Sequence, residues 1–271
     1  MIQNIDPHIY HNEYRPVPPH GTDIVFCFDG NTVFLQPDHT VYHVSDLPDS
    51  HGLYWLFCID DVQYYLREEI PEDAVGENIR TLRGFEPHYL GFAAITAWQI
   101  YVWKNENRYC GRCGHPMKED SRERAMRCPD CGHIVYPRIN PAVIVAVRND
   151  QNQLLVTKYA NSTYNRYALI AGFNEVGETI EETVIREVKE EAGLDVEDLH
   201  YYKCQPWSFS STLLFGFWCR VKGDDTIRID ENELKTGRWA DRSEPEIDPG
   251  DQASLTAEMI RIFLEGKDTD E

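Results

Sequence analysis

The spacing of apolar positions differs between the two halves of the chain. Between residues 23 and 66, short apolar runs such as IVFCF, TVFLQ and LYWLFCI are separated by Gly, Pro, Asp and Asn, which is typical of short antiparallel strands. Residues 85–104 carry apolar side chains at helical spacing and predict a helix. Residues 1–20 mix proline with polar groups and predict a loosely held arm.

The second half mixes strands and helices. Apolar segments predict strands at 142–148, 153–159, 167–173, 199–207 and 212–221, a helix after residue 179 and a last helix near 251–264. This mixture indicates an α/β or α+β domain. The polar residues 266–271 predict a disordered tail.

Four of the eight cysteines form two C-x₂-C pairs, Cys110–Cys113 and Cys128–Cys131, separated by 14 residues. This spacing predicts a closed tetrahedral zinc site with a structural role, although iron would need the same four sulfurs. A glycine follows each pair and allows a tight turn around a metal. The other four cysteines are expected to be small buried side chains: Cys27, Cys58, Cys204 and Cys219.

Charge narrows the range of functions. The chain of 271 residues has a formal net charge of −20, so binding to long nucleic acids by bulk electrostatics is disfavoured. Phosphates would have to be bound at a local site, with metal ions in between. The sequence shows neither a leader peptide nor an apolar run of membrane-spanning length, which predicts a cytoplasmic protein without membrane association and with reduced thiols.

Residues 179–193 predict a helix with an acidic face. Thr179 and Glu182 have capping-box spacing, and Gly193 suits the left-handed residue that ends a helix. An aliphatic stripe would pack against a sheet: Ile180, Val184 and Val188. A solvated acidic surface is the simplest interpretation of such a helix by itself.

The carboxylates of this helix point to a cation site. Glu187, Glu190 and Glu191 share one helix face, and Glu178 stands just before the helix. Their mutual repulsion needs compensation, and Mg²⁺ or Mn²⁺ fits because hard divalent cations prefer oxygen ligands. Arg186 can orient one of the glutamates by a bidentate pair.

The stretch from Gly172 to Leu194 resembles the Nudix box at each of the positions that define it: Gly172, Glu178, Arg186, Glu187, Val188, Glu190, Glu191, Gly193 and Leu194. The chain is thereby identified as similar to the Nudix hydrolases, which cleave nucleoside diphosphates linked to a further group. Two more features resemble the NADH pyrophosphatase subfamily, namely the cysteine ribbon directly before the domain and the join formed by Tyr136-Pro137-Arg138 and Asn140-Pro141.

A third feature is similar to the SQPWPFPxS motif of that subfamily: Gln205, Pro206, Trp207, Ser208, Phe209, Ser210, Ser211 and Thr212. Cys204, Ser208 and Ser210 stand where the motif has Ser, Pro and Pro, and the loss of two prolines would loosen this loop. The retained glutamine and aromatic residues would supply hydrogen bonds and flat apolar surface for a dinucleotide.

The resemblance also implies roles for single residues. The catalytic set would be Glu187, Glu190, Glu191, Arg186 and Glu178. The Mg²⁺ or Mn²⁺ ligands would be Glu187, Glu190, Glu191, the Ala171 carbonyl and Glu233. Besides the motif of residues 205–212, substrate contacts would come from Tyr136, Phe173, Glu123 and Ala253. From the sequence alone, Tyr136 and Phe173 would be core aromatics and Glu233 a solvated glutamate.

The expected fold is α+β, with an N-terminal β-rich domain that ends in a helix (1–107), a zinc ribbon (108–137) and a C-terminal Nudix α/β/α sandwich (138–271). The expected function is metal-dependent hydrolysis of NADH or NAD⁺ to AMP and nicotinamide mononucleotide. The alternatives are a Nudix hydrolase of ADP-ribose or dinucleoside polyphosphates, and a regulator whose ribbon binds DNA.

Two partners are also implied. The subfamily removes NAD caps from RNA 5′ ends, and residues 110–138 carry six basic against four acidic side chains, a local excess of +2. Such a patch could guide a short RNA 5′ end, or could simply keep the ribbon soluble. Members of the subfamily usually act as homodimers.

Overall fold

The computed structural model describes residues 1–160, 166–244, 246–250 and 252–268. The chain folds as two compact units. One unit is formed by residues 2–138 and 208–210, and the other by Met1 with the chain from residue 139 onward, without 208–210. Each unit has mixed sheets and few helices, which is the α+β class. None of the helices in the described part is long and apolar enough to cross a membrane.

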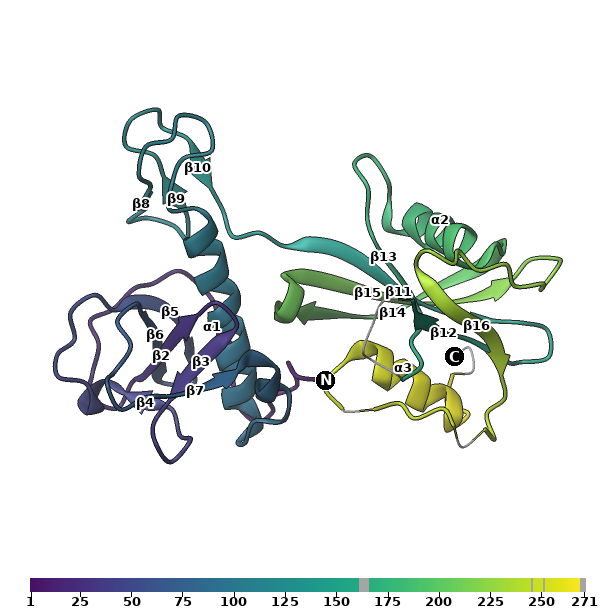
Figure 1. Cartoon of the computed structure of the whole chain (residues 1–271), viewed down its shortest axis with the longest axis horizontal. Helices are drawn as coiled ribbons and strands as arrows, with labels where there is room; N and C mark the ends of the chain where they lie inside the picture. The colour runs from purple at the N-terminus through teal and green to yellow at the C-terminus, as the bar shows by residue number, and fades with distance from the viewer. Residues whose placement is uncertain (161–165, 245, 251, 269–271) are drawn as a thin grey trace. The chain divides into compact units, whose positions relative to one another are not determined.

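The first unit contains a sheet of seven strands (Figure 1). Its order is β1 (Tyr10–His11), β5 (Tyr54–Ile59), β6 (Val62–Arg67), β2 (Ile24–Asp29), β3 (Thr32–Leu35) and β7 (Val75–Asn78), with β4 (Tyr42–His43) on β2. The neighbours are antiparallel except β2 and β6, which run parallel. The expectation of short strands is confirmed, and the parallel pair is an exception to the expected antiparallel order.

Helix α1 (His88–Glu106) packs on this sheet and confirms the helix predicted at 85–104. It follows a 3₁₀ helix at Ile79–Gly84. Its buried residues are distributed around the whole helix, as in a helix covered on several sides. Trp98 donates to the Gly30 carbonyl at 2.9 Å, and Tyr101 accepts from the Gly30 amide at 3.1 Å, so α1 is tied to the β2–β3 turn.

The N-terminal arm is not loosely held, contrary to the expectation. Ile2 and Ile5 are buried, and β1 pairs with β5 in an antiparallel ladder. Asp60 accepts hydrogen bonds from the Ile9 amide at 2.8 Å and interacts with the His8 ring at 2.7 Å. The many prolines and polar groups of the arm predicted a loose segment, but two buried side chains three residues apart, Ile2 and Ile5, hold it on the protein.

A small sheet with the order β10 (Ile134–Val135), β9 (Met126–Arg127) and β8 (Lys118–Glu119) completes the first unit. Both pairs are antiparallel. This ribbon carries the two cysteine pairs on the turns beside its strands.

The second unit is built on a six-stranded sheet. Its order is β14 (Val196–Trp207), β15 (Thr212–Val221), β11 (Asn140–Arg148), β12 (Leu154–Tyr159) and β16 (Leu234–Ala240), and β13 (Ile170–Phe173) pairs with β11. β11 and β15 are parallel in a ladder from Asn140–Thr212 to Arg148–Arg220. β16 was not predicted, while the other strands and the helix α2 (Ile180–Ala192) confirm the expected elements.

The side-chain alternation of β11 divides the apolar core into two layers. Val143, Val145 and Val147 are buried in the cluster that contains α2, whereas Ile144 and Ala146 are buried in the cluster that contains α3 (Leu255–Leu264). Successive residues of a strand face opposite sides of the sheet, so the two helices cover opposite faces, as Figure 1 shows. The result is an α/β/α sandwich.

The end of the chain differs from the expectation. The last helix begins at Leu255 rather than near 251, and Ser254 caps it by accepting from the Ala257 amide. Residues 266–268 are ordered: the Asp268 carboxylate is buried and pairs with Arg148 and Arg242. The rest of the expected disordered tail, residues 269–271, lies outside the described residues.

Candidate functional site

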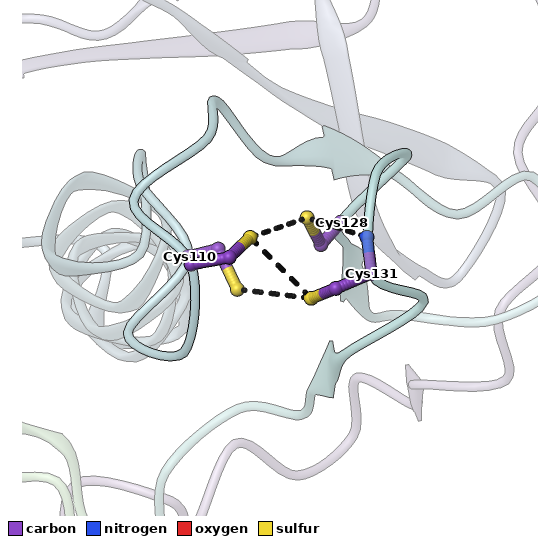
Figure 2. Close-up of side chains that lie close together, drawn as sticks. Cys110, Cys128 and Cys131 are labelled. Atoms are coloured by element: carbon purple, nitrogen blue, oxygen red, sulfur yellow. Dashed lines mark hydrogen bonds between the residues drawn. The ribbon is translucent and has the colours of Figure 1, made fainter.

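The four ribbon cysteines converge on one point. Their Sγ atoms all lie within 4.8 Å of one another, and the pairs Cys110–Cys131, Cys113–Cys128 and Cys113–Cys131 are 3.6, 3.5 and 3.4 Å apart. Figure 2 shows Cys110, Cys128 and Cys131 directed toward one another. Zn–S bonds of about 2.3 Å in a tetrahedron place sulfurs about 3.8 Å apart, so the cluster fits zinc with little adjustment.

The backbone around the cysteines favours metal binding. Gly114 and Gly132 have φ of 77° and 72°, which confirms the expected tight turns. Burial disfavours the Cys110 thiolate, but hydrogen bonds from the backbone amides of Arg112 and Cys113 prevail and lower the pKa of Cys110 to about 7. At Cys113 a hydrogen bond from the His115 amide is outweighed by burial and the neighbouring thiols, which raise the pKa to about 12, so the thiolate that a metal requires is favoured at Cys110.

Helix α2 is fixed at both ends by the predicted signals. The Thr179 hydroxyl accepts from the Glu182 amide at 3.2 Å, and the Glu182 carboxylate accepts from the Thr179 amide at 2.8 Å. Gly193 ends the helix with φ 72°. Val184 and Val188 are fully buried and Ile180 packs against the same cluster, so the acidic face is turned to one side of the sheet.

Arg186 forms the predicted bidentate pair, and its partner is Glu178. Nε and Nη2 donate to the two Glu178 oxygens at 2.6 and 2.9 Å, and Thr183 donates to the same carboxylate at 2.9 Å. The guanidinium therefore holds the pKa of Glu178 down at about 2. A salt-bridged anchor thus joins the segment before the helix to its middle.

The same guanidinium reaches the other carboxylates. Its Nη1 donates to Glu187 at 2.7 Å and to Glu190 at 3.0 Å, and Nη2 donates to the Phe173 carbonyl at 2.9 Å. Arg186 therefore links α2 to the end of β13. Its own pKa is raised because several carboxylates surround it, Glu178 first among them.

Glu187 and Glu191 are buried, whereas Glu190 is exposed. Burial, together with the charges of Glu187 and Glu233, raises the pKa of Glu191 to about 8, against a hydrogen bond from the Ala171 amide. Oε2 of Glu191 has no hydrogen-bond partner among the described residues. Burial also raises the pKa of Glu187.

Gly172 explains how Glu187 comes so close to the sheet. A Cβ atom at this position would lie 1.9 Å from Cδ of Glu187 and 2.1 to 2.2 Å from its oxygens. Only glycine leaves this space for the carboxylate. The Glu191 carboxylate thus lies within the electrostatic influence of Glu187 and Glu233 and accepts from the Ala171 amide, while Glu190 is exposed and paired with Arg186.

This acidic cluster fits a hard divalent cation. It holds two buried carboxylates and an unpartnered buried oxygen, Gly172 leaves the space that the Glu187 carboxylate occupies, and all its donors are oxygens. Across the described ranges, three or more ligand atoms within 4.8 Å of one another occur only at the cysteines and in the overlapping set Cys113, His115 and Asp130. The glutamates are not among these groups, and Arg186 forms ion pairs with Glu187 and Glu190.

Among the expected substrate contacts, Tyr136 and Glu123 lie together. The Tyr136 hydroxyl donates to the Glu123 carboxylate at 3.0 Å. Tyr136 and Phe173 are each 55% exposed, so neither is the core aromatic that their residue type by itself suggests. Both rings offer flat apolar surface to a ligand.

Gln205 and Ala253 also lie together, with Gln205 completely buried. Its Nε2 donates to the Ala253 carbonyl at 2.8 Å, and its Oε1 accepts from the Leu255 amide at 2.6 Å. The side-chain amide thereby fixes the segment that enters α3. The expected hydrogen-bonding capacity of Gln205 is used here on the protein's own backbone.

The rest of the motif spans a turn between β14 and β15. Pro206 is exposed and Trp207 half-buried, residues Ser208–Ser210 form a 3₁₀ turn, and Ser211 has φ 52°. Ser208 and Thr212 are buried, while Phe209 is half-buried. The two serines that replace motif prolines therefore lie in a regular turn.

Sequence reasoning missed two residues beside the acidic cluster. Asp230 donates its amide to the Glu191 carbonyl at 3.0 Å, and its charge also raises the pKa of Glu191. Removal from water and the charge of Glu191 raise the pKa of Tyr159 to about 12. Neither residue lies in a recognisable pattern, so no signal in the sequence indicated them. Of the four cysteines expected in the core, Cys27 and Cys219 are buried, Cys58 is half-buried and Cys204 is exposed.

Two family models match the chain. Residues 138–261 match the NUDIX domain, and residues 105–136 match the NADH pyrophosphatase zinc ribbon domain. A solved NUDIX hydrolase from Nitrosomonas europaea is 25% identical, with a TM-score of 0.49 over 58% of this chain and 91% of its own.

Curated relatives carry one name. The chain is 43% identical over 143 residues to "NAD-capped RNA hydrolase NudC" of Vibrio atlanticus, a match that covers 52% of each chain. It is 33% identical over 208 residues to the protein of the same name from Pseudomonas aeruginosa, which covers 74% of this chain and 72% of the relative. The matched region thus spans about half of the first relative and more than two thirds of the second.

Proposed function

Because the chain belongs to the Nudix hydrolase family, in the group whose NUDIX domain follows an NADH pyrophosphatase zinc ribbon, we propose that it hydrolyses the pyrophosphate of NADH or NAD⁺. The products are AMP and nicotinamide mononucleotide. The observation that carries this proposal is the buried carboxylate pair Glu187–Glu191 beside Gly172, with Oε2 of Glu191 unpartnered.

Glu187, Glu190, Glu191, Glu233 and the Ala171 carbonyl would hold Mg²⁺ or Mn²⁺. When bound, such ions neutralise the pyrophosphate and lower the pKa of a water molecule. Glu191 or Glu190 would serve as the base that takes a proton from the attacking water, or would hold the metal ion that lowers the pKa of this water.

Other residues bind and orient the substrate. Arg186 keeps Glu178 and Glu187 in place through its ion pairs. The exposed rings of Tyr136 and Phe173 stack on the nicotinamide end of the substrate. Ala253 also contacts the substrate, and the hydrogen bond from Gln205 holds the segment around Ala253 in place. The zinc ribbon has a structural role, since four thiolates fill a tetrahedral shell and leave no position for water.

We further propose that NAD-capped RNA is a substrate, as the names of the curated relatives state for those proteins. The ribbon has six basic side chains, of which Arg112, Lys118 and Arg122 are exposed to a 5′ end, whereas Arg124 and Arg127 contact other residues of the protein; the sixth is Arg138. Arg112 is exposed, and the Arg122 side chain is 79% exposed. An electrostatic role predicts that RNA cleavage falls more steeply with salt than NADH cleavage does, and equal salt dependence would remove this role.

The decisive experiment is product analysis with NADH, NAD⁺, ADP-ribose and NAD-capped RNA in Mg²⁺ or Mn²⁺. We expect the highest kcat/KM on NAD(H) or the capped RNA, with AMP (or a 5′-monophosphate RNA) as product. A preference for ADP-ribose or dinucleoside polyphosphates would instead support the alternative hydrolase. Duplex DNA binding at low salt without hydrolysis would support the regulator.

Glu191→Gln should lower turnover on the order of 100-fold or more, because the buried carboxylate is lost while its volume is kept. Glu181→Gln is the matched control, since Glu181 lies exposed on the same helix. Near-normal turnover of Glu191→Gln would contradict the assignment of the site.

A cytoplasmic location and a homodimer complete the proposal. Reduced thiols, which a zinc-binding ribbon requires, are stable in the cytoplasm. The molecular mass of the protein in solution tests the homodimer. The zinc content of the purified chain tests metal binding by the ribbon.

A further inference from the structure

The loop Asp120–Ala125 of the ribbon carries Glu123, whose carboxylate accepts a hydrogen bond from the Tyr136 hydroxyl. The base of this loop is closed by a hydrogen bond from the Asp120 amide to the Ala125 carbonyl at 2.9 Å. The Asp120 carboxylate accepts from the Arg122 amide at 2.8 Å and from Arg127 Nε at 2.6 Å. These bonds fix the ends of the loop.

Arg124 fixes the middle of the loop from another side. Its guanidinium carbon lies 5.8 Å from the ring centre of Tyr14 and 5.7 Å from that of Trp55. Its Nη2 donates to Asn12 Oδ1 at 3.1 Å, and its Nη1 is buried without a hydrogen-bond acceptor in the described part of the chain. A guanidinium that lies against two rings is held by cation–π attraction and apolar contact.

The two rings form a stable seat. Trp55 lies on β5 and is buried in the core of the N-terminal sheet, where its indole donates to Gln63 at 2.8 Å. Tyr14 packs edge-to-face on Trp55 at 5.8 Å and donates to the Asp120 carbonyl at 3.3 Å. The N-terminal segment therefore contacts the same loop at two points.

We propose that Arg124 is a positioning residue: its seat between Tyr14 and Trp55 fixes the Glu123–Tyr136 pair for the substrate. This inference rests on the proposed function, in which Glu123 and Tyr136 contact the dinucleotide. It gives the N-terminal sheet a part in substrate binding. Arg122, two residues earlier in the same loop, is 79% exposed, and its ion pair with Asp120 is 3.9 Å long.

The kinetic test compares Arg124→Ala with Arg15→Ala, an exposed arginine next to Tyr14, on NADH. We expect Arg124→Ala to raise KM about 3- to 10-fold, the loss that one or two cation–π contacts imply, with kcat little changed. Arg15→Ala should resemble the wild type. In a Glu123→Gln background, which removes the charge of this carboxylate, Arg124→Ala should have little further effect, because both changes weaken the same contact, that of the Glu123 carboxylate with the substrate.

Hydrogen exchange of the amides of residues 121–127 provides a readout without activity. Arg124→Ala should accelerate this exchange, and Arg15→Ala should not. Unchanged exchange and unchanged KM in Arg124→Ala would overturn the inference, as would full additivity with Glu123→Gln. If the wild type does not hydrolyse NADH but the loop exchanges faster in Arg124→Ala, the proposed function fails while the anchoring by Arg124 holds.

Discussion

At the scale of single residues, the close approach of Gly172 and Glu187 determines where the carboxylate lies. A Cβ at residue 172 would collide with the end of the Glu187 side chain rather than with backbone. Such an end can swing away at small cost in stability. The glycine is therefore needed for the position of a functional group more than for the fold.

Gly172→Ala is expected to lower kcat/KM for NADH at least about tenfold while the free energy of unfolding changes little, because the displaced carboxylate moves and the sheet does not. Steady-state kinetics and urea unfolding measure the two effects. Gly84→Ala is the control, since a Cβ there meets nothing within 4 Å. Equal activity in the two variants would contradict this account.

Residue spacing predicted much of the candidate site. The cysteine pairs, the capping box and the Arg186–Glu190 pair follow local rules of three or four residues, and local rules are visible in one sequence. Tyr159 and Asp230 reach Glu191 only through the fold, and Gln205 is buried only because α3 begins beside β14. Contacts of this kind have no local pattern.

At the scale of elements, α3 is attached to the sheet by polar contacts as well as by its apolar face. Glu258 accepts from Lys203 at 2.7 Å and from Tyr202 at 2.8 Å, and both partners lie on β14. Burial opposes the charge of Glu258, but these two partners prevail and lower its pKa below the usual 4.5. A lowered carboxylate pKa stabilises the fold above the unfolded-state pKa, and this contribution is lost as the pH falls through the folded-state value.

Wild-type protein should lose stability as the pH falls from about 5 to below the folded-state pKa of Glu258. Glu258→Gln should lose less stability over the same range, because glutamine does not titrate. Urea unfolding of the second unit at several pH values gives the slope of stability against pH. The exposed Glu231→Gln should keep the wild-type slope. A slope for Glu258→Gln equal to that of the wild type would show that the contact contributes nothing.

Elements with a clear local pattern of apolar residues were predicted from the sequence. Elements that depend on pairing with a distant strand were not. β11 is a continuous apolar run with both faces buried, and α2 has an apolar stripe, so each is visible in the sequence. β16 contains Lys, Thr, Gly and Arg, and it is a strand because it pairs with β12. The parallel ladder of β11 with β15 joins residues about 70 positions apart, which no local pattern can specify.

At the scale of the whole molecule, the end of the described chain is tied to the sheet of the second unit. The Asp268 carboxylate accepts from Arg148 at 3.2 Å and from Arg242 Nη2 at 2.9 Å, and Arg148 also lies over the Trp218 ring. The net charge of −20 suggests an acidic surface and did not indicate that one acidic side chain, Asp268, is buried between two arginines.

Asp268→Ala should destabilise the second unit by about 3 kcal/mol, because it leaves the buried Arg148 without its carboxylate. Urea unfolding measures the change. Glu265→Ala removes an exposed pair with Lys267 and should have no measurable effect. If both variants unfold like the wild type, the chain end does not anchor this unit.

Gly172 and Phe173 are neighbours with opposite freedom to vary. Every other amino acid carries a Cβ, so no replacement at 172 leaves the Glu187 carboxylate in place, whereas the half-exposed ring of Phe173 meets solvent and can be exchanged without disturbing the sheet. In a library that randomises both positions and is selected on pyrophosphates that lack a nicotinamide ring, surviving enzymes should converge on glycine at 172 and diverge at 173. Selection for new substrates then has one adjustable position directly beside one that is fixed.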